Sequence, residues 1–428
     1  MAPPNRELRS SFSIAERIDR FCVHFGFGRA FGLMLPTESS PGRKFVPELD
    51  VLRGIAALAM ILNHAGYRLL SAQDATQSGV SALVFFGSFA PAIFFFATGF
   101  GIGLSRSPEP RPFDGLGVFW KAALLIVSDQ FFFWSKGVVW GLDFFSFIAI
   151  ATVVVSLLSR LRGAVSVCLS LAALLLLTRY GFAPLWSPSE HPIPALEWIW
   201  GVRGVTAVSY PLSPWMCFPL TGFACGVAYR GVNLTERWQR NLWLHRGGML
   251  AIVCLAAALG LFLMDKSFFR WGTVSVSFFI LALGVVTVLG LFSVLAVIYG
   301  HRIPNALALR GVASFAVIPL HYALLEVVVQ LLPQPMLPLY FVFIVVCVIC
   351  VTFVGASKFA DFAATVASAP RQTLLFAWIV AAVFVLGVAI HSSTLSSGAP
   401  AAVVTLLAQL LIATLLGIRF PVSRKVLV

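Results

Sequence analysis

The chain has 428 residues, of which 59% are hydrophobic and 11% are charged, and its mean hydropathy is +0.93. These values lie far outside the range of soluble globular proteins, so they exclude that class and indicate a polytopic membrane protein. The net charge of +13 is explained by basic loops on one side of a membrane and by attraction to anionic lipid. We therefore expect membrane lipids, and no nucleic acid, among its partners.

About 12 apolar segments are long enough to cross a bilayer core, which takes roughly 20 residues each. They predict an all-α transmembrane bundle. The segments lie near residues 51–70, 82–104, 117–134, 142–159, 163–178, 210–229, 247–264, 273–298, 308–332, 335–355, 373–390 and 400–418.

Lysine and arginine gather in alternate connections, and basic loops stay on the cytoplasmic side during insertion. This bias predicts that both termini are cytoplasmic. Residues 1–45 carry apolar side chains at helical spacing with Arg17 and Arg20 among them, which predicts an interfacial amphipathic segment. We expect a transmembrane core over residues 46–332 and additional transmembrane helices over residues 333–428.

The first apolar segment carries an arginine and a histidine eleven residues apart, Arg53 and His64. Eleven helical steps of about 100° return close to the starting direction, so Arg53, Ala57, Met60 and His64 share one face that rises about 16 Å. One helix thus places a guanidinium at the membrane edge and an imidazole inside. An ion pair between Arg53 and Asp50 that only anchors the helix is the alternative reading of the arginine.

Ionisable residues inside a membrane are costly, so each is a candidate functional group. The orientation above brings five of them to comparable depth, which predicts one polar cavity: His64, Asp129, Asp143, His321 and Glu326. A histidine there suits general-base chemistry, and an adjacent carboxylate would orient its ring. Asp129 and Asp143 are the expected partners of His64; hydrogen bonds that only join helices are the alternative for each group.

Six of the seven cysteines fall within the apolar segments, where we interpret them as buried, small apolar residues. Cys347 and Cys350 have the spacing of a metal or redox motif, but no second ligand pair accompanies them. We expect no metal site. Gly99, Gly101 and Gly103 are better explained by close helix packing than by binding a phosphate.

The segment from Glu48 to His64 resembles the first-helix signature of a membrane acyltransferase superfamily. That superfamily includes the acyltransferase-3 family and the heparan-alpha-glucosaminide N-acetyltransferase-like family. Further segments resemble the second branch in chain order: Pro91–Phe100, Asp143–Ala149, Tyr210–Trp215 with Thr221–Phe223, and Val312–His321. The resemblance covers roughly residues 45–330. No paired arginines of the acyltransferase-3 type occur in 117–134, which favours the heparan-type branch or an intermediate one.

The resemblance implies that an acyl group, usually acetyl, passes from cytoplasmic acyl-CoA to a hydroxyl or amine of an envelope carbohydrate or lipid-linked acceptor. His64 matches the family histidine as base or transient acyl carrier, with Asp143 or Asp129 orienting it. Arg53 and Lys121 are expected to bind coenzyme A, which is a co-substrate and not a tightly bound cofactor. We expect the acceptor to contact a further set: His321, Trp215, Tyr210 and Asn63.

Two other functions remain open. A transporter or lipid flippase would use the buried histidine and aspartate residues as a proton or substrate relay. A non-catalytic membrane subunit would support a polysaccharide-producing complex. We expect a multi-pass protein of the bacterial inner membrane, and the acceptor, the acyl length and a homo-oligomeric state are left open.

Overall fold

The fold is described here from a computed structural model. It describes residues 46–77, 79–106, 114–134, 141–182, 198–200, 208–232, 236–264, 275–300, 306–367, 378, 381–382 and 399–416. These residues form helices and no strand, which confirms the all-α class, and one isolated bridge joins Leu142 to Val208. The predicted interfacial segment within residues 1–45 lies outside the described residues.

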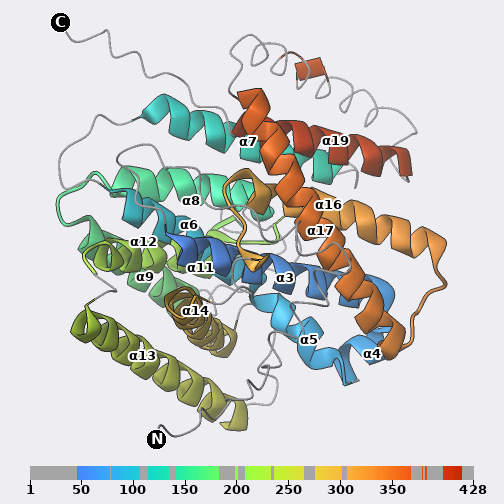
Figure 1. The fold of residues 1–428 in the computed structure, drawn as a ribbon. Helices are drawn as coiled ribbons and strands as arrows, with labels where there is room; N and C mark the ends of the chain where they lie inside the picture. Colours follow the sequence, from blue (N-terminus) through green and yellow to red (C-terminus); the bar gives the residue numbers. More distant parts are fainter. Residues whose placement is uncertain are drawn as a thin grey trace, which may run out of the picture. The chain divides into compact units, whose positions relative to one another are not determined.

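The helices follow the predicted apolar segments in order (Figure 1). They are α3 (Pro47–Leu69), α4 (Ala72–Gln77), α5 (Ser81–Phe86), η1 (Gly87–Phe89), α6 (Ala90–Ser105), α7 (Gly115–Trp134), α8 (Phe144–Leu158), α9 (Ala164–Leu177), the π-helical turn η2 (Thr178–Phe182), α11 (Leu212–Trp215), α12 (Cys217–Arg230), α13 (Arg237–Met264), α14 (Val276–Ile298), α16 (Val312–Leu331), α17 (Pro338–Ala367) and α19 (Ala399–Leu416).

Seven helices in the described ranges are long and apolar enough to cross a membrane. Two shorter apolar helices, Phe144–Leu158 and Thr405–Leu416, accompany them. Most of the predicted segment 373–390 lies outside the described residues. The protein is therefore a multi-helix membrane protein, while the total of about 12 spans and the side of each terminus stay predictions.

Helix α3 lies among the other helices and contacts α5, α6, α14, α16 and α17 (Figure 1). Pro47 in its first turn suits a helix start because proline has no amide hydrogen to leave unpaired there. Both ends are tied to distant segments: the amide of Leu309 donates to the carbonyl of Asp50 at 3.0 Å, and that of Met336 donates to the carbonyl of Leu69 at 2.7 Å. These bonds fix the two ends of α3.

Helices α6 and α12 pack with their backbones in close contact. A side chain at Gly99 or Gly103 would collide with the backbone of α12, and one at Gly222 or Gly226 would collide with the backbone of α6. Spaced glycines of this kind let membrane helices approach closely, and van der Waals packing then holds them together. The packing interpretation of Gly99 and Gly103 is confirmed, whereas Gly101 faces the guanidinium of Arg53.

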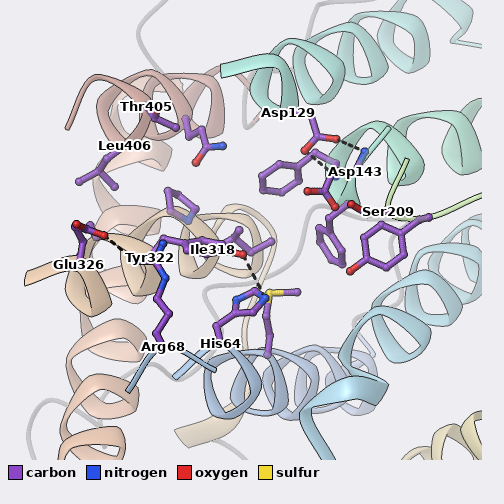
Figure 2. A pocket seen from close by; sticks show the side chains of 17 residues that line it. His64, Arg68, Asp129, Asp143, Ser209, Ile318, Tyr322, Glu326, Thr405 and Leu406 are labelled. Carbon is purple, nitrogen blue, oxygen red and sulfur yellow. Dashed lines mark hydrogen bonds and ion pairs between the residues drawn. The ribbon is translucent and has the colours of Figure 1, made fainter. Parts of the chain in front are cut away.

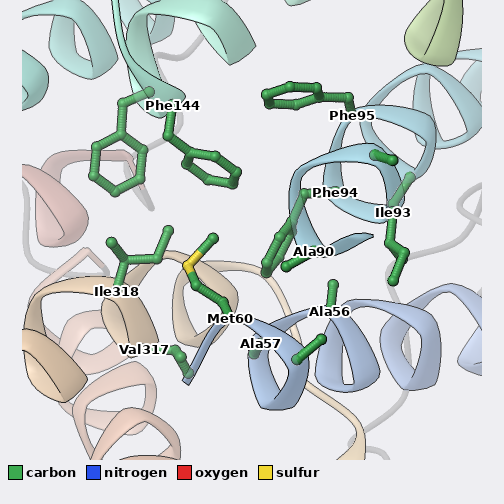
Figure 3. Close-up of a cluster of buried hydrophobic side chains, with 14 of the residues drawn as sticks. Ala56, Ala57, Met60, Ala90, Ile93, Phe94, Phe95, Phe144, Val317 and Ile318 are labelled. Atoms are coloured by element: carbon green, nitrogen blue, oxygen red, sulfur yellow. The ribbon is translucent and has the colours of Figure 1, made fainter. Parts of the chain in front are cut away.

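Aromatic and aliphatic side chains fill the space between α3, α6, α8 and α16 (Figure 3). Phe95 is at the centre of an aromatic group, with ring centroids 4.1 Å from Phe147, 5.3 Å from Tyr210 and 5.8 Å from Trp215. The last two contacts are edge-to-face, an arrangement that aromatic quadrupoles favour. This core supports one wall of the site described below.

The interpretation of all six cysteines as buried is wrong for two of them. Cys168, Cys217 and Cys254 are buried and Cys225 is half-buried, but Cys347 and Cys350 are exposed on α17. The two lie three residues apart and therefore share one face of the helix. Hydropathy cannot tell whether a helix face contacts lipid or other helices, because both environments are apolar.

Candidate active site

A cavity of about 410 Å³ opens between α3, α16, the junction of α7 and α8, residues 209–210 and α19 (Figure 2). Its volume is typical of small-molecule sites. Ten of its lining residues carry polar groups or rings with a polar atom: His64, Arg68, Asp129, Asp143, Ser209, Tyr210, Tyr322, Glu326, Thr405 and Gln409. The structure thus brings four of the five ionisable groups expected inside the membrane to one cavity, and the fifth, His321, contacts His64 directly.

Helix α3 presents Met60, His64 and Arg68 to the cavity because residues four apart lie on one helical face. Both ring nitrogens of His64 have protein partners. Nδ1 lies 2.8 Å from Nε2 of His321, and Nε2 lies 3.2 Å from the hydroxyl of Tyr322. Both partners come from α16, so a helix far away in the sequence orients the imidazole that α3 carries.

The two aspartates lie at the junction of α7 and α8. The carboxylate of Asp129 is buried and accepts backbone N–H groups at the start of α8, from Asp143 at 3.2 Å, Phe145 at 3.3 Å and Ser146 at 2.8 Å. A carboxylate there satisfies helix-terminal donors and complements the helix dipole. Asp143 is the residue before the helix and lines the cavity. Orientation of His64 by either carboxylate stays a prediction.

An ion pair bridges the cavity between α3 and α16. Arg68 Nη1 lies 2.7 Å from Glu326 Oε2, and its guanidinium carbon lies 5.9 Å from the ring centroid of Tyr322 (Figure 2). Sequence reasoning did not assign site roles to Arg68 or Tyr322. Two signals could have found them: Arg68 is four residues after His64 on the same face, and Tyr322 directly follows His321.

The predicted acceptor residues lie in different surroundings. Tyr210 lines the cavity, held there because Ser209 donates its amide to the carbonyl of Leu142 at 2.9 Å. Trp215 is 1% exposed and packs edge-on against Tyr210, with ring centroids 5.2 Å apart. Asn63 donates from its side-chain amide to the carbonyl of Val84 at 3.1 Å. Tyr210 thus reaches the cavity itself, whereas Trp215 supports it from behind.

The residues predicted to bind coenzyme A lie away from the cavity. Arg53, near the start of α3, forms a 3.0 Å ion pair with Asp50, whose other oxygen lies 3.8 Å from Arg310. Arg310 was not identified from the sequence, and it brings a second guanidinium to this end of α3. Lys121 is exposed on α7. Binding of coenzyme A by Arg53 or Lys121 stays a prediction.

Comparison with known proteins identifies the family of this region. Residues 46–256 match the family described as heparan-alpha-glucosaminide N-acetyltransferase, catalytic. This part of the chain belongs to the heparan-alpha-glucosaminide N-acetyltransferase-like family of membrane acyltransferases. No curated protein and no solved structure gives a significant match. The resemblance found in the first-helix segment is therefore confirmed.

The family region contributes only part of the cavity. It contains α3, α7, α8 and residues 209–210, which carry His64, Asp129, Asp143 and Tyr210. Helices α16 and α19 follow it in the chain and close the cavity from the other side with Tyr322, Glu326 and Gln409. The arrangement around His64 therefore combines the catalytic region of an acyltransferase family with helices outside the matched segment.

Proposed function

We propose that the protein is a membrane acyltransferase in which His64 is the catalytic base. The observation that carries this proposal is the position of His64: the histidine of the family signature lines a polar cavity with both ring nitrogens in hydrogen-bond contact. An imidazole held in one orientation can take a proton from a hydroxyl or amine at neutral pH. Membership of an acyltransferase family supports the same chemistry.

In the proposed reaction, an acceptor hydroxyl or amine enters the cavity and gives its proton to His64 as it attacks the thioester carbon of an acyl-CoA. The tetrahedral intermediate collapses, the carbon–sulfur bond breaks, and the thiolate of coenzyme A takes the proton from the imidazolium. Atoms and charge balance without another reactant. In a second route, His64 itself attacks the thioester carbon and displaces the thiolate of coenzyme A; the acceptor then attacks the acyl-imidazole, the carbon–nitrogen bond breaks, and the acceptor's proton passes to the thiolate.

We propose acetyl as the acyl group and a carbohydrate or lipid-linked acceptor at the cell envelope. The cavity supports a polyhydroxylated acceptor because its lining combines hydrogen-bonding groups with the aromatic residues Tyr210 and Tyr322. The donor would enter from the end of α3 where Arg53 and Arg310 flank Asp50. Guanidinium groups suit phosphates, and Arg53 lies roughly 16 Å along the helix from His64.

The experiment uses the full chain, purified in detergent and incubated with acetyl-CoA labelled in the acetyl group and with extracted envelope carbohydrate and lipid. Free thiol release and label transfer are measured together. We expect wild type to release coenzyme A and label an acceptor, and His64→Ala to lose at least about 100-fold in rate. His245→Gln on α13, an exposed histidine, is the matched control and should keep the wild-type rate.

Transfer by His64→Ala at the wild-type rate would remove His64 from the mechanism. A second arm measures solute or lipid movement in vesicles that contain the protein. Movement without consumption of acetyl-CoA would identify a transporter or flippase and overturn the proposal.

A further inference from the structure

A chain of polar contacts runs from the backbone of α16 through both histidines to Tyr322. Nδ1 of His321 lies 2.9 Å from the carbonyl oxygen of Val317, and Nε2 of His321 lies 2.8 Å from Nδ1 of His64. Nε2 of His64 lies 3.2 Å from the hydroxyl of Tyr322. Each contact needs one donor and one acceptor, so the positions of the hydrogens along the chain depend on one another.

The carbonyl oxygen of Val317 determines which group donates and which accepts in each of these hydrogen bonds. A carbonyl oxygen can only accept, so Nδ1 of His321 carries the hydrogen and donates to Val317. His321 is completely buried, and a neutral imidazole costs far less to bury than a charged one. A neutral imidazole protonated at Nδ1 has its lone pair on Nε2. That nitrogen can therefore only accept a hydrogen bond from His64.

The consequence for His64 follows directly. Its Nδ1 must carry a hydrogen and donate it to His321, which leaves the lone pair of the neutral ring on Nε2, the nitrogen beside Tyr322. The ring planes of the two histidines are inclined by only 14° and their centroids lie 5.1 Å apart. This arrangement lets the N–H of one ring point toward the in-plane lone pair of the other.

We propose that His321 is a positioning residue that fixes the tautomer of His64, so that Nε2 is the basic nitrogen and the Tyr322 hydroxyl marks where the acceptor's hydroxyl or amine donates. The catalytic part of this inference depends on the proposed function, whereas the tautomer does not. His321 acts through His64 and does not line the cavity.

The same contacts also suit the protonated ring. When the acceptor gives its proton to Nε2, the hydrogen bond from Nδ1 of His64 to His321 is unchanged. Only the hydroxyl hydrogen of Tyr322 turns: it moves away to free the lone pair of Nε2 for the acceptor, and after the transfer the Tyr322 oxygen can accept from Nε2. No ring has to rotate and no hydrogen has to leave His321. The chain is thus compatible with both states that a general base passes through.

The direct test is nitrogen NMR of the full chain, labelled with ¹⁵N-histidine, in detergent or nanodiscs at a pH where His64 is neutral. The His64 signals are assigned by their loss in His64→Gln. We expect Nδ1 of His64 to be protonated and Nε2 to be unprotonated in wild type. In His321→Leu, which removes the acceptor, we expect a mixture of both tautomers.

Rescue and kinetics separate positioning from folding. His321→Gln places an amide oxygen within reach of His64 and should restore part of the wild-type tautomer population. We expect His321→Leu to lower kcat by at least about tenfold with a much smaller change in KM, while His245→Gln changes neither. Thermal unfolding of each variant reports the fold independently.

Two results would overturn the inference: protonation of His64 at Nε2 in the neutral wild type, or an unchanged tautomer in a folded His321→Leu. If His321→Leu does not fold, the wild-type spectrum and His321→Gln still decide the question. A protein with the expected tautomer but no acyl transfer would contradict the proposed function and leave the hydrogen-bond chain intact.

Discussion

Helices α3 and α13 are both long enough to cross a membrane. In a soluble protein the more apolar of two helices is expected to be the more buried, but here the relation between hydropathy and burial is reversed. Helix α3 is the less apolar of the two and the more deeply buried, whereas α13 packs mainly against α14 (Figure 1). Helix α13 also exposes apolar side chains, with Leu263 72% and Met264 86% exposed. In a membrane, an apolar side chain is as stable against lipid as in the protein core, so high hydropathy does not indicate burial inside the protein. Polar groups therefore mark the interior, and here they mark the cavity.

Glycines sharpen the contrast between well-packed and peripheral helices. Gly99 on α6 and Gly222 on α12 lie against neighbouring backbone, but Gly248 and Gly260 on α13 have open space where a side chain would project. The same residue type thus allows a close backbone approach at Gly99 and Gly222, whereas Gly248 and Gly260 have no such role. Substitutions matched between these regions test whether the comparison holds.

The largest effect on stability is expected at Asp129. Replacement by alanine leaves three backbone N–H groups at the start of α8 without their acceptor, and we expect the free energy of unfolding to fall by about 3 kcal/mol. Asp129→Asn keeps one acceptor oxygen, so its free energy of unfolding should lie between those of wild type and Asp129→Ala. Denaturant titration in micelles measures the change.

The control for Asp129 is the exposed Asn241→Ala on α13, which should change stability by no more than about 0.5 kcal/mol. Equal stability of Asp129→Ala and wild type would show that the carboxylate does not cap α8.

A smaller loss is expected at the contact between α6 and α12. Gly99→Ala forces the two backbones apart and should destabilise the protein by about 2 kcal/mol. Gly260→Ala meets no neighbour and should stabilise α13 by up to about 1 kcal/mol, because alanine is the better helix former. The two variants are compared by thermal unfolding, and shifts of the same sign would contradict the packing difference.

Asn63 should contribute about 1 kcal/mol through its hydrogen bonds to α5 and η1. Its amide donates to the carbonyl of Val84 and to the hydroxyl of Ser88 at 3.4 Å, and the net value of such bonds is modest. Asn63→Ala is measured beside Asn241→Ala on α13. A loss no greater than that of the control would mean that Asn63 acts elsewhere, including in the predicted acceptor site.

The smallest effect is expected for the ion pair between Arg68 and Glu326. Both side chains are partly exposed, at 40% and 34%, so we expect a coupling free energy of about 0.5 kcal/mol that decreases at high salt. A double-mutant cycle with Arg68→Ala and Glu326→Ala isolates it. A coupling several times larger, insensitive to salt, would show that the pair is shielded from water.

Several features of the site could be predicted from residues alone. The face of α3 that carries Met60 and His64 follows from helical spacing, and His64, Asp129 and Asp143, which were expected in one polar cavity, all line the same cavity. The expected apolar segment 142–159 also contains α8, which begins directly after Asp143. These predictions succeed because they depend on local periodicity and on the cost of charge in lipid.

Contacts between distant segments could not be predicted. His64 and His321 are 257 residues apart, and many pairings of buried polar groups satisfy the same rule that such groups need partners. The sequence favoured a carboxylate beside His64, whereas the contacts described for its ring nitrogens come from a histidine and a tyrosine. Trp215 and Tyr210 share one motif, yet only Tyr210 lines the cavity.

Composition, hydropathy and the spacing of Arg53 and His64 by themselves determined that this is a helical membrane protein with an acyltransferase signature, because lipid demands long apolar helices and helical periodicity defines a face. The tertiary structure alone decided which groups meet: α16 brings His321 and Tyr322 to the two nitrogens of His64, and α7 brings Asp129 to the start of α8. Packing between helices depends on the shapes of whole surfaces, which no local pattern encodes.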